Sequence, residues 1–307
     1  MDLSVVVPTL NGRDQLARTL DSLSGAAPDA EVVVVNGPSA DGTTGMVRDR
    51  DDVDILVEIA DRTVSVARNA GIERASGDAV ALVDHGLAVR DGWEETVRTG
   101  LSETDVVTGP TRRSLRAGST TDTVESRTIV GRKVTFFNSG NVAFRRAVLD
   151  AFDGFDEYLD VGSARDLAHR VASGDYTVAW DSEMAVEQAY GSDGGEPERD
   201  WGWKYRSLGY RLSKNYGVRP TVIGRLASHA GSDAISALGD VLRRNTDPSE
   251  WFGTGRRVVS GAAVGVKDGL KARTSDRSAA RNPNGAADRT DRAVTVYDWR
   301  DASRPPP

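Results

Sequence analysis

Residues 31–43 read Glu-Val-Val-Val-Val-Asn-Gly-Pro-Ser-Ala-Asp-Gly-Thr. Four consecutive valines predict a strand that is buried on both faces of a parallel sheet. The segment that follows predicts a tight turn into a helix, because Gly37 and Gly42 permit backbone conformations that other residues resist. Asp41 is placed to cap that helix, and Asn36 lies at the strand tip, where its amide is available to a base edge. An ordinary strand-to-helix turn explains this segment, taken alone, equally well.

The same alternation extends in both directions along the chain. We expect further strands at residues 3–7, 55–59, 79–83, 105–108, 138–144 and 176–180, and helices at 12–24, 62–75, 93–101, 145–151 and 163–173. This order predicts an α/β fold with a Rossmann-like, mostly parallel sheet and helices on both faces. Such sheets bind ligands at the carboxyl ends of their strands. The residues that follow Val7, Val35 and Val83 are therefore the predicted site.

The pattern divides the chain into three predicted regions. Residues 1–190 form the α/β domain, with a polar and mobile excursion at 110–135. Residues 191–272 form an aromatic, basic and helical region, with amphipathic helices at 221–244 and 256–272. Residues 273–307 contain few apolar side chains, and we expect a disordered tail there.

Composition excludes several functional classes. The chain has 307 residues, 46 Asp plus Glu, 39 Lys plus Arg, and a net charge of -7. This acidity argues against nucleic acid as the main partner. No cysteine is present, which excludes a thiol nucleophile and a zinc site with cysteine ligands. We expect no signal peptide and no transmembrane helix, because Pro8 interrupts the first apolar run and no later run approaches ~18 residues.

Polar residues follow the first and fourth strands in a pattern suited to a nucleotide. The first strand ends Pro8-Thr9-Leu10-Asn11-Gly12, and the fourth ends Leu82-Val83-Asp84-His85-Gly86. Arg68, in Ala-Arg-Asn-Ala-Gly-Ile, is suited to neutralising a diphosphate. Asp84 is placed to hold a ribose hydroxyl or a divalent metal. As isolated features, Arg68 fits a salt-bridge partner equally well, and Asp84 fits a helix cap.

Together these motifs closely resemble the glycosyltransferase family 2 domain, which has the GT-A fold. The resemblance covers roughly residues 3–190 and includes two later motifs, Asn138-Ser139-Gly140-Asn141 and Gly154-Phe155-Asp156. It implies a nucleoside-diphosphate sugar donor, usually UDP-linked, and a divalent metal, Mg²⁺ or Mn²⁺. It also implies inverting transfer, in which a carboxylate takes the proton of the acceptor hydroxyl and the metal neutralises the departing diphosphate. The nucleotide-binding positions carried over are Pro8, Asn11, Asn36, Asp41, Arg68 and Asp84.

Two motifs depart from the family pattern. Where the family has Asp-x-Asp, this chain has Asp84-His85-Gly86, so Asp84 and His85 are the candidate metal ligands, although a lone loop histidine is more often merely solvated. Where the family has Gly-Glu-Asp-x-Asp-Leu, this chain has Gly162-Ser163-Ala164-Arg165-Asp166-Leu167. Asp166 is then the candidate base, with Asp160 in reserve. Because Asp166 opens a helix, complementing the helix dipole explains it equally well.

The region from Trp201 to Tyr216 mixes aromatic residues with cations, a composition typical of a membrane headgroup region or a phosphate-bearing lipid acceptor. Packing between helices is the alternative explanation. The acidic, Arg-rich and Lys-poor composition resembles haloarchaeal family 2 transferases. That resemblance implies addition of one sugar, often a hexuronic acid, to a dolichol phosphate-linked glycan. The reaction would serve N-glycosylation of surface-layer proteins at the cytoplasmic face of the membrane, with the enzyme bound peripherally. Arg112, Arg113 and Arg116 are the candidate cations for an acidic donor sugar.

Two other functions stay open. Because the second metal carboxylate and the Glu-Asp pair are missing, the domain fits a catalytically dead sugar-nucleotide or glycan-binding scaffold of a glycan-assembly complex. A nucleotidyltransferase on a similar sheet is less favoured, since no Gly- and Lys/Arg-rich phosphate loop follows the first strand. The sequence indicates neither the sugar nor the oligomeric state.

Overall fold

The computed structural model describes residues 1–113, 123–188, 200–242 and 248–300, and they fall into two compact units. The first unit comprises Met1–Arg127, Lys133–Asp193 and Asn284–Pro307, and the second comprises Thr128–Arg132 and Gly194–Pro283. The predicted division at residues 190 and 272 differs from this one, because the end of the chain belongs to the first unit.

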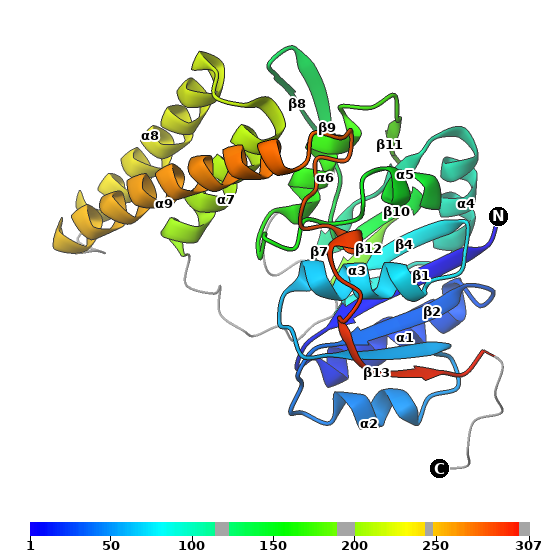
Figure 1. Ribbon diagram of the computed structural model, residues 1–307. Helices are drawn as coiled ribbons and strands as arrows, with labels where there is room; N and C mark the ends of the chain where they lie inside the picture. Colours follow the sequence, from blue (N-terminus) through cyan, green and yellow to red (C-terminus); the bar gives the residue numbers. More distant parts are fainter. Residues whose placement is uncertain (114–122, 189–199, 243–247, 301–307) are drawn as a thin grey trace. The chain divides into compact units, whose positions relative to one another are not determined.

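The first unit is built on an eight-stranded sheet with the strand order β11-β6-β10-β4-β1-β2-β3-β13 (Figure 1). Strands β1, β2, β3 and β4 pair in parallel, as do β6 and β11, whereas β10 and β13 run antiparallel to their neighbours. The strands are β1 Leu3–Thr9, β2 Glu31–Asn36, β3 Ile55–Ile59, β4 Ala79–Val83, β6 Val106–Thr108, β10 Asn141–Arg145, β11 Val178–Trp180 and β13 Ala293–Asp298. The expected mostly parallel α/β sheet is confirmed.

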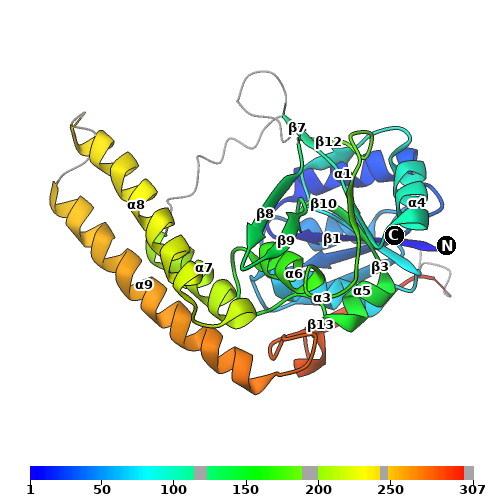
Figure 2. The same ribbon diagram turned by 90° about the horizontal axis from the view of Figure 1, so that it is seen from above.

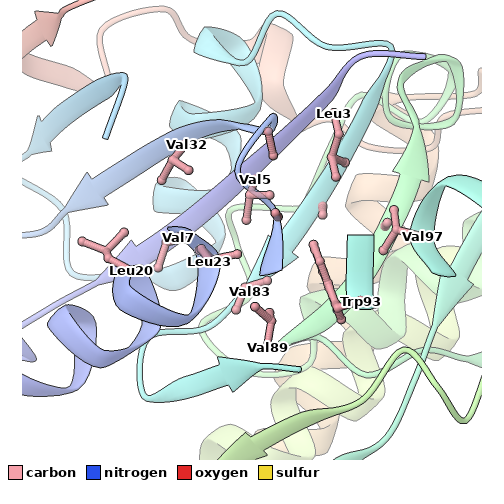
Figure 3. Packing of buried hydrophobic residues seen from close by; sticks show 14 of the residues in the cluster. Leu3, Val5, Val7, Leu20, Leu23, Val32, Val83, Val89, Trp93 and Val97 are labelled. Carbon is pink, nitrogen blue, oxygen red and sulfur yellow. The ribbon is translucent and has the colours of Figure 1, made fainter. Parts of the chain in front are cut away.

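Helices cover both faces of this sheet. The strand residues alternate between faces, so Val5 and Val7 of β1 pack with Leu20 of α1 and Trp93 of α4 (Figure 3). Val6 points the other way, toward α3, where a Cβ added to Gly71 would lie 2.3 Å from its Cγ1. The helices are α1 Arg13–Ala26, α2 Thr43–Arg48, α3 Val64–Arg74, α4 Trp93–Glu103, α5 Arg146–Ala151 and α6 Ser163–Val171. This packing holds the carboxyl ends of the central strands rigidly at one edge.

Two small sheets supplement the large one. Strands β5, Leu87–Val89, β12, Val186–Gln188, and β7, Thr111–Arg113, form one of them, and β8, Glu125–Ile129, pairs with β9, Arg132–Phe136, in the other. The sequence missed these strands because they are short and rich in polar residues. The excursion predicted at 110–135 is therefore wrong at residues 111–113, 125–129 and 132–135, which are in strands. Residues 114–122, which include Arg116, lie outside the described part of the chain.

The predicted disordered tail is wrong for residues 276–300. After a 3₁₀ turn at Ala286–Asp288, strand β13 pairs antiparallel with β3 and completes the sheet edge (Figure 1). Arg292 is buried and pairs with Glu157 and Glu73. The strand itself is largely apolar, but it is short and lies in a stretch that is polar on average, so composition alone missed it. Main-chain pairing with β3 and the ion pairs of Arg292 hold it in place. Residues 301–307 lie outside the described range.

The second unit contains three helices, α7 Trp201–Tyr216, α8 Pro220–Leu242 and α9 Pro248–Ser275 (Figure 2). Helices α7 and α9 pack at very close range through glycines. A Cβ added to Gly261 or Gly265 would lie within 2.2 Å of a backbone oxygen of α7. Tyr205 and Tyr210 of α7 are buried, so helix packing explains much of the aromatic content of this stretch. Among the described residues, no helix is long and apolar enough to span a membrane.

Candidate active site

A pocket of about 270 Å³ lies at the carboxyl ends of β1, β2, β3 and β4. Its lining residues are Pro8, Thr9, Leu10, Gly37, Ile59, Asp61, Arg62, Thr63, Val64, Ala67, Asp84 and His85. This is the edge at which parallel α/β sheets bind ligands. The sequence located this edge, and it named Pro8, Asp84 and His85 among the lining residues.

A larger hollow of about 630 Å³ lies at the opposite, amino-terminal ends of β1 and β4. Its lining includes Arg98, Arg145 and Arg146. Each of these guanidinium groups already donates hydrogen bonds to backbone carbonyls. The hollow is thus a surface whose cations serve the fold, and the smaller pocket is the better candidate.

Asp84, which lines the pocket, forms an ion pair with Arg68, which lies behind it and is not among the lining residues. An Nη2 hydrogen of Arg68 is donated to Asp84 Oδ1 at 2.9 Å, and the same nitrogen lies 3.1 Å from the carbonyl oxygen of Ser139. The Arg68 side chain is 4% exposed, while that of Asp84 is 37% exposed. The Nε of Arg68 is buried without a hydrogen-bond partner. An unpaired buried donor of this kind is costly unless a ligand completes it.

Thr9, which lines the pocket, also carries a buried polar atom that has no hydrogen-bond partner in the protein. Thr9 Oγ1 is buried, with Thr9 only 4% exposed, and it makes no hydrogen bond in the structure. The sequence analysis quoted Thr9 only as part of a motif and gave it no role. The signal that could have identified Thr9 is its position as the last residue of β1, at the carboxyl edge of the sheet. Arg62 also lines the pocket and shows no ion pair among the described residues.

His85 is held in one orientation. Its Nδ1 lies 3.1 Å from the carbonyl oxygen of Pro8, and a carbonyl only accepts, so Nδ1 carries the hydrogen. In the neutral ring, Nε2 therefore keeps the lone pair that binds a metal or a proton. The ring fits against Gly12, where an added Cβ would lie 2.5 Å from His85 Cδ2.

The donor set at this edge is compatible with a divalent ion bound jointly with phosphate. Asp84 offers the carboxylate oxygen that Arg68 does not contact, and His85 offers Nε2. No group of three or more His, Cys, Asp or Glu residues suited to a metal occurs among the described residues. Mg²⁺ and similar ions are commonly held by one or two protein groups together with substrate phosphates. A metal here would depend on the nucleotide for the rest of its ligands.

Asn11, Asn36 and Asp41 build the wall beside the pocket and are not among its lining residues. The backbone N–H of Asn11 donates to Ser39 Oγ at 2.8 Å, and Asn11 Oδ1 accepts from the N–H of Ala40. Ser39 in turn donates to Asn36 Oδ1. These bonds join the turn after β1 to the turn after β2.

The side chains of Asn36 and Asp41 are already engaged within the protein. The Asn36 amide nitrogen donates to Thr44 Oγ1 at 3.0 Å, and Asn36 is 1% exposed. Asp41 accepts from the N–H of Arg13 at 3.0 Å and from Thr43. The expectation that Asn36 pairs with a base edge is not supported by this geometry, because its amide organises the turn.

Asp166 does not occupy the position that a catalytic base requires. Its side chain is 0% exposed and pairs with the equally buried Arg170 at 2.8 Å. Arg170 also donates to the carbonyls of Phe152 and Gly154. Asp166 therefore joins α6 to the preceding turn, and the prediction that it is the base is corrected. The sequence prediction was wrong because an acidic residue in the first turn of a helix looks the same in the sequence whether it is a catalytic base or a buried ion-pair partner.

Asp160 is exposed and lies beside the pocket. Thr63 Oγ1, on the pocket lining, is 3.4 Å from Asp160 Oδ1. Asp160 lies in the loop before α6, two residues upstream of the segment Gly162–Leu167 where the resemblance places the base motif. Of the two carboxylates considered from sequence, the structure brings only Asp160 next to the pocket.

The C-terminal segment supports the rim of the pocket. Arg289 lies 3.5 Å from Asp61 Oδ2 and 3.0 Å from Glu157 Oε2. Burial raises the pKa of Asp61, but hydrogen bonds from Thr63 and the charge of Arg289 outweigh it and hold this pKa below its ordinary value. Sequence reasoning missed this contact because Arg289 lies in a stretch without periodicity.

The fold is shared with solved structures of glycosyltransferases. The structure of the mannosyltransferase PcManGT from Pyrobaculum calidifontis in complex with GDP-Man and Mn²⁺ covers 87% of both chains, with a TM-score of 0.56 and 18% identity. S. aureus TarS in complex with UDP covers 90% of this chain and 91% of its own, with a TM-score of 0.58 and 16% identity. At these identities the likeness concerns the fold. Residues 4–152 match the model described as Glycosyl transferase family 2.

Similarity to individual relatives is partial. Glycosyltransferase AglE of Haloferax volcanii is 31% identical over 111 residues, covering 34% of this chain and 36% of that protein. The pre-mycofactocin glycosyltransferase of Mycobacterium tuberculosis is 26% identical over 190 residues, covering 55% of this chain and 39% of its own. The matches thus span well under half the length of these curated relatives.

Proposed function

We propose that this protein transfers a single sugar from a nucleoside-diphosphate donor to an acceptor hydroxyl, with inversion at the anomeric carbon. The observation that carries the proposal is the pocket at the ends of β1–β4, whose lining includes Asp84, the ion-pair partner of Arg68, and Thr9, whose buried hydroxyl has no partner. Buried polar atoms without partners mark a surface that a polar ligand completes. The match of residues 4–152 to the glycosyltransferase family 2 model supports this reading.

The donor would be bound by both cationic and anionic side chains. Arg68, through its free Nε, and Arg62 would contact the diphosphate, since guanidinium groups match phosphate oxygens. Asp84 would hold a ribose hydroxyl or, with His85, a Mg²⁺ or Mn²⁺ ion. Such an ion supplies charge neutralisation for the departing diphosphate. We favour a UDP-linked donor.

Asp160 is the proposed base. It lies beside Thr63 at the pocket rim, where a carboxylate accepts a proton from an acceptor hydroxyl approaching from solvent. The exposed position allows an acceptor to reach it, which the buried Asp166 does not. Family members that add sugars processively carry a Gln-x-x-Arg-Trp motif, and its absence here favours a single addition.

For the acceptor we propose a dolichol phosphate-linked glycan of archaeal protein N-glycosylation, at the cytoplasmic face of the membrane. The partial similarity to AglE of Haloferax volcanii and the acidic, Lys-poor composition support this. A hexuronic acid is the proposed sugar. Arg112, in strand β7, is a candidate for its carboxylate, whereas the side chains of Arg113 and Arg116 lie outside the described part of the structure.

Calorimetric titration with UDP, with and without Mn²⁺, tests the donor site. Arg68→Ala should weaken UDP binding at least ~10-fold, because it removes charge-assisted hydrogen bonds worth ~1.5–3 kcal/mol in all. Arg18→Ala, on the exposed face of α1, is the matched control and should bind like the parent. If the parent protein binds neither UDP nor GDP, the proposal is wrong.

A second measurement separates transfer from mere binding. In a strain that lacks the gene, mass spectrometry of lipid-linked oligosaccharides should show assembly stalled one sugar short, and the missing mass identifies the sugar. Complementation with Asp160→Asn should leave the stall, because a neutral amide accepts no proton. If Asp160→Asn restores the full glycan while retaining UDP binding, the base is another group.

The alternative is a scaffold that binds sugar nucleotide or glycan without catalysis. Gly86 in place of the second metal carboxylate, and Ser163-Ala164 in place of the Glu-Asp pair, favour it. Unchanged glycan assembly in both the Asp84→Ala and Asp160→Asn strains, with folding intact, would support the scaffold over the enzyme.

A further inference from the structure

Helix α9 packs on α7 and also contacts α8, and a further side of it is exposed to solvent over the described residues 255–271. Gly261, Gly265 and Gly269 recur every four residues and face α7, where added Cβ atoms would meet α7 at 2.0–2.2 Å. Because a helix turns 100° per residue, Arg256 and Lys267 lie about half a turn from Gly265. Both are exposed, as is Lys271 one turn further on. The glycine stripe therefore fixes which side of α9 faces outward.

That outward face is cationic and lacks carboxylates within residues 255–275. The one acidic residue of this stretch, Asp268, points elsewhere and pairs with Arg206 of α7 at 3.0 Å. Arg256, Lys267 and Lys271 form no ion pair with any described residue. Unpaired cations on an exposed helix face are available to an anionic partner.

The charge is segregated along the chain. Residues 200–283 hold 15 Lys plus Arg against seven Asp plus Glu, a net charge of +8, whereas the whole chain carries -7. Four of the five lysines, Lys204, Lys214, Lys267 and Lys271, lie in this helical unit. Since the rest of the protein is strongly acidic, the excess is local to the unit rather than a general compositional bias.

Exposed aliphatic side chains accompany these cations. Val259 of α9 is 69% exposed and Val264 is 42% exposed, while Ile223 of α8 is 55% exposed and Val218, just before α8, is 54% exposed. A surface that reads nucleic acid gains little from bare aliphatic groups, whose contribution lies in burial away from water. Aliphatic groups beside Lys and Arg are instead the composition of helices that lie in a bilayer interface.

We propose that the outward face of α9, with the start of α8, binds the surface of a membrane rich in anionic lipids. The lysine and arginine side chains would contact lipid phosphates, and the valines would enter the headgroup boundary. The inference goes beyond the proposed transfer reaction, because it concerns a separate unit and is measured without donor or acceptor. It also moves the predicted lipid contact from the tyrosines of α7, which are buried, to α9.

Vesicle flotation of the full chain tests the proposal. The parent protein should bind vesicles of phosphatidylcholine with 30% phosphatidylglycerol and float poorly with phosphatidylcholine alone. Lys267→Glu with Lys271→Glu should reduce the partition coefficient at least ~30-fold, since each cation near an anionic leaflet contributes about fivefold. Val259→Ser with Val264→Ser should reduce the binding that survives high salt, because salt screens only the charges.

A matched charge reversal outside the helical unit controls for net charge. Arg18→Glu with Lys133→Glu changes the protein charge by the same amount and should float like the parent. Both double variants should retain UDP affinity, so a failed donor site and a failed lipid surface are distinguishable. Equal flotation of the two double variants would overturn the proposal. So would tighter binding of the parent to single-stranded RNA than to the anionic vesicles.

Discussion

At the residue scale, the two carboxylates that the sequence motifs single out, Asp84 and Asp166, have opposite environments. Asp84 is partly exposed and forms an ion pair with Arg68, whereas Asp166 is fully buried and forms an ion pair with Arg170. A buried ion pair is maintained by its geometry and by the hydrogen bonds that satisfy its remaining groups. Arg170 donates such bonds to the carbonyl oxygens of Phe152 and Gly154. The difference lies in desolvation, which a one-dimensional motif does not report.

Asp166→Ala should therefore lower stability rather than remove only activity. The substitution leaves the Arg170 guanidinium buried without its counter-charge, which costs ~3–5 kcal/mol. Urea unfolding of the variant measures this loss, and Asp160→Asn, at an exposed position, should change stability by less than ~0.5 kcal/mol. An Asp166→Ala protein as stable as the parent would show that the pair contributes little.

At the element scale, glycines decide how closely the helices of the second unit approach. A Cβ at Gly265 would lie 2.0 Å from the carbonyl oxygen of Arg206, which is backbone and cannot rotate away. Gly224 of α8 has nothing within 4 Å of its added Cβ. The same residue type is thus required for packing at one position and is only a weak helix former at the other.

Gly265→Ala and Gly224→Ala should act in opposite directions. The first forces α7 and α9 apart, and overpacking of this kind costs ~1–3 kcal/mol. The second gains up to about 1 kcal/mol of helix propensity. Hydrogen exchange of the α7 and α9 amides, followed by mass spectrometry, should be faster in the first variant and unchanged or slower in the second. Equal protection in both variants would argue against close helix packing.

At the scale of the whole molecule, the last described strand, β13, returns to the sheet that β1 begins. Strand β13 covers the edge of β3, and Arg292 and Arg289 tie the segment before it to Glu157. An uncovered sheet edge is a template for pairing with another chain. The C-terminal segment therefore covers the edge of the sheet, and through Arg289 it also holds Asp61 at the edge of the pocket.

A chain that ends after Ser275 should lose both effects. Removing β13 exposes β3, and removing Arg292 leaves Glu157 and Glu73 without their cation, so we expect a lower melting temperature and concentration-dependent aggregation by light scattering. Truncation at Asp298 keeps the strand and serves as the control. Equal melting temperatures for the two truncated proteins would show that the edge strand is dispensable.

The sequence by itself determined the central sheet and the edge that carries the site. Every residue of runs such as Val32–Val35 and Ala79–Val83 is buried. A continuous apolar run of this kind is visible in the sequence itself, and the residue at which it stops predicts the end of the strand. The tertiary structure alone decided that Asp166 is an internal ion-pair partner, that Thr9 and Arg62 face the pocket, and that residues 284–298 return to the sheet. Each of these depends on contacts between residues far apart in the chain. The physical reason is that burial and pairing belong to the folded surroundings of a side chain, whereas periodicity belongs to the chain itself.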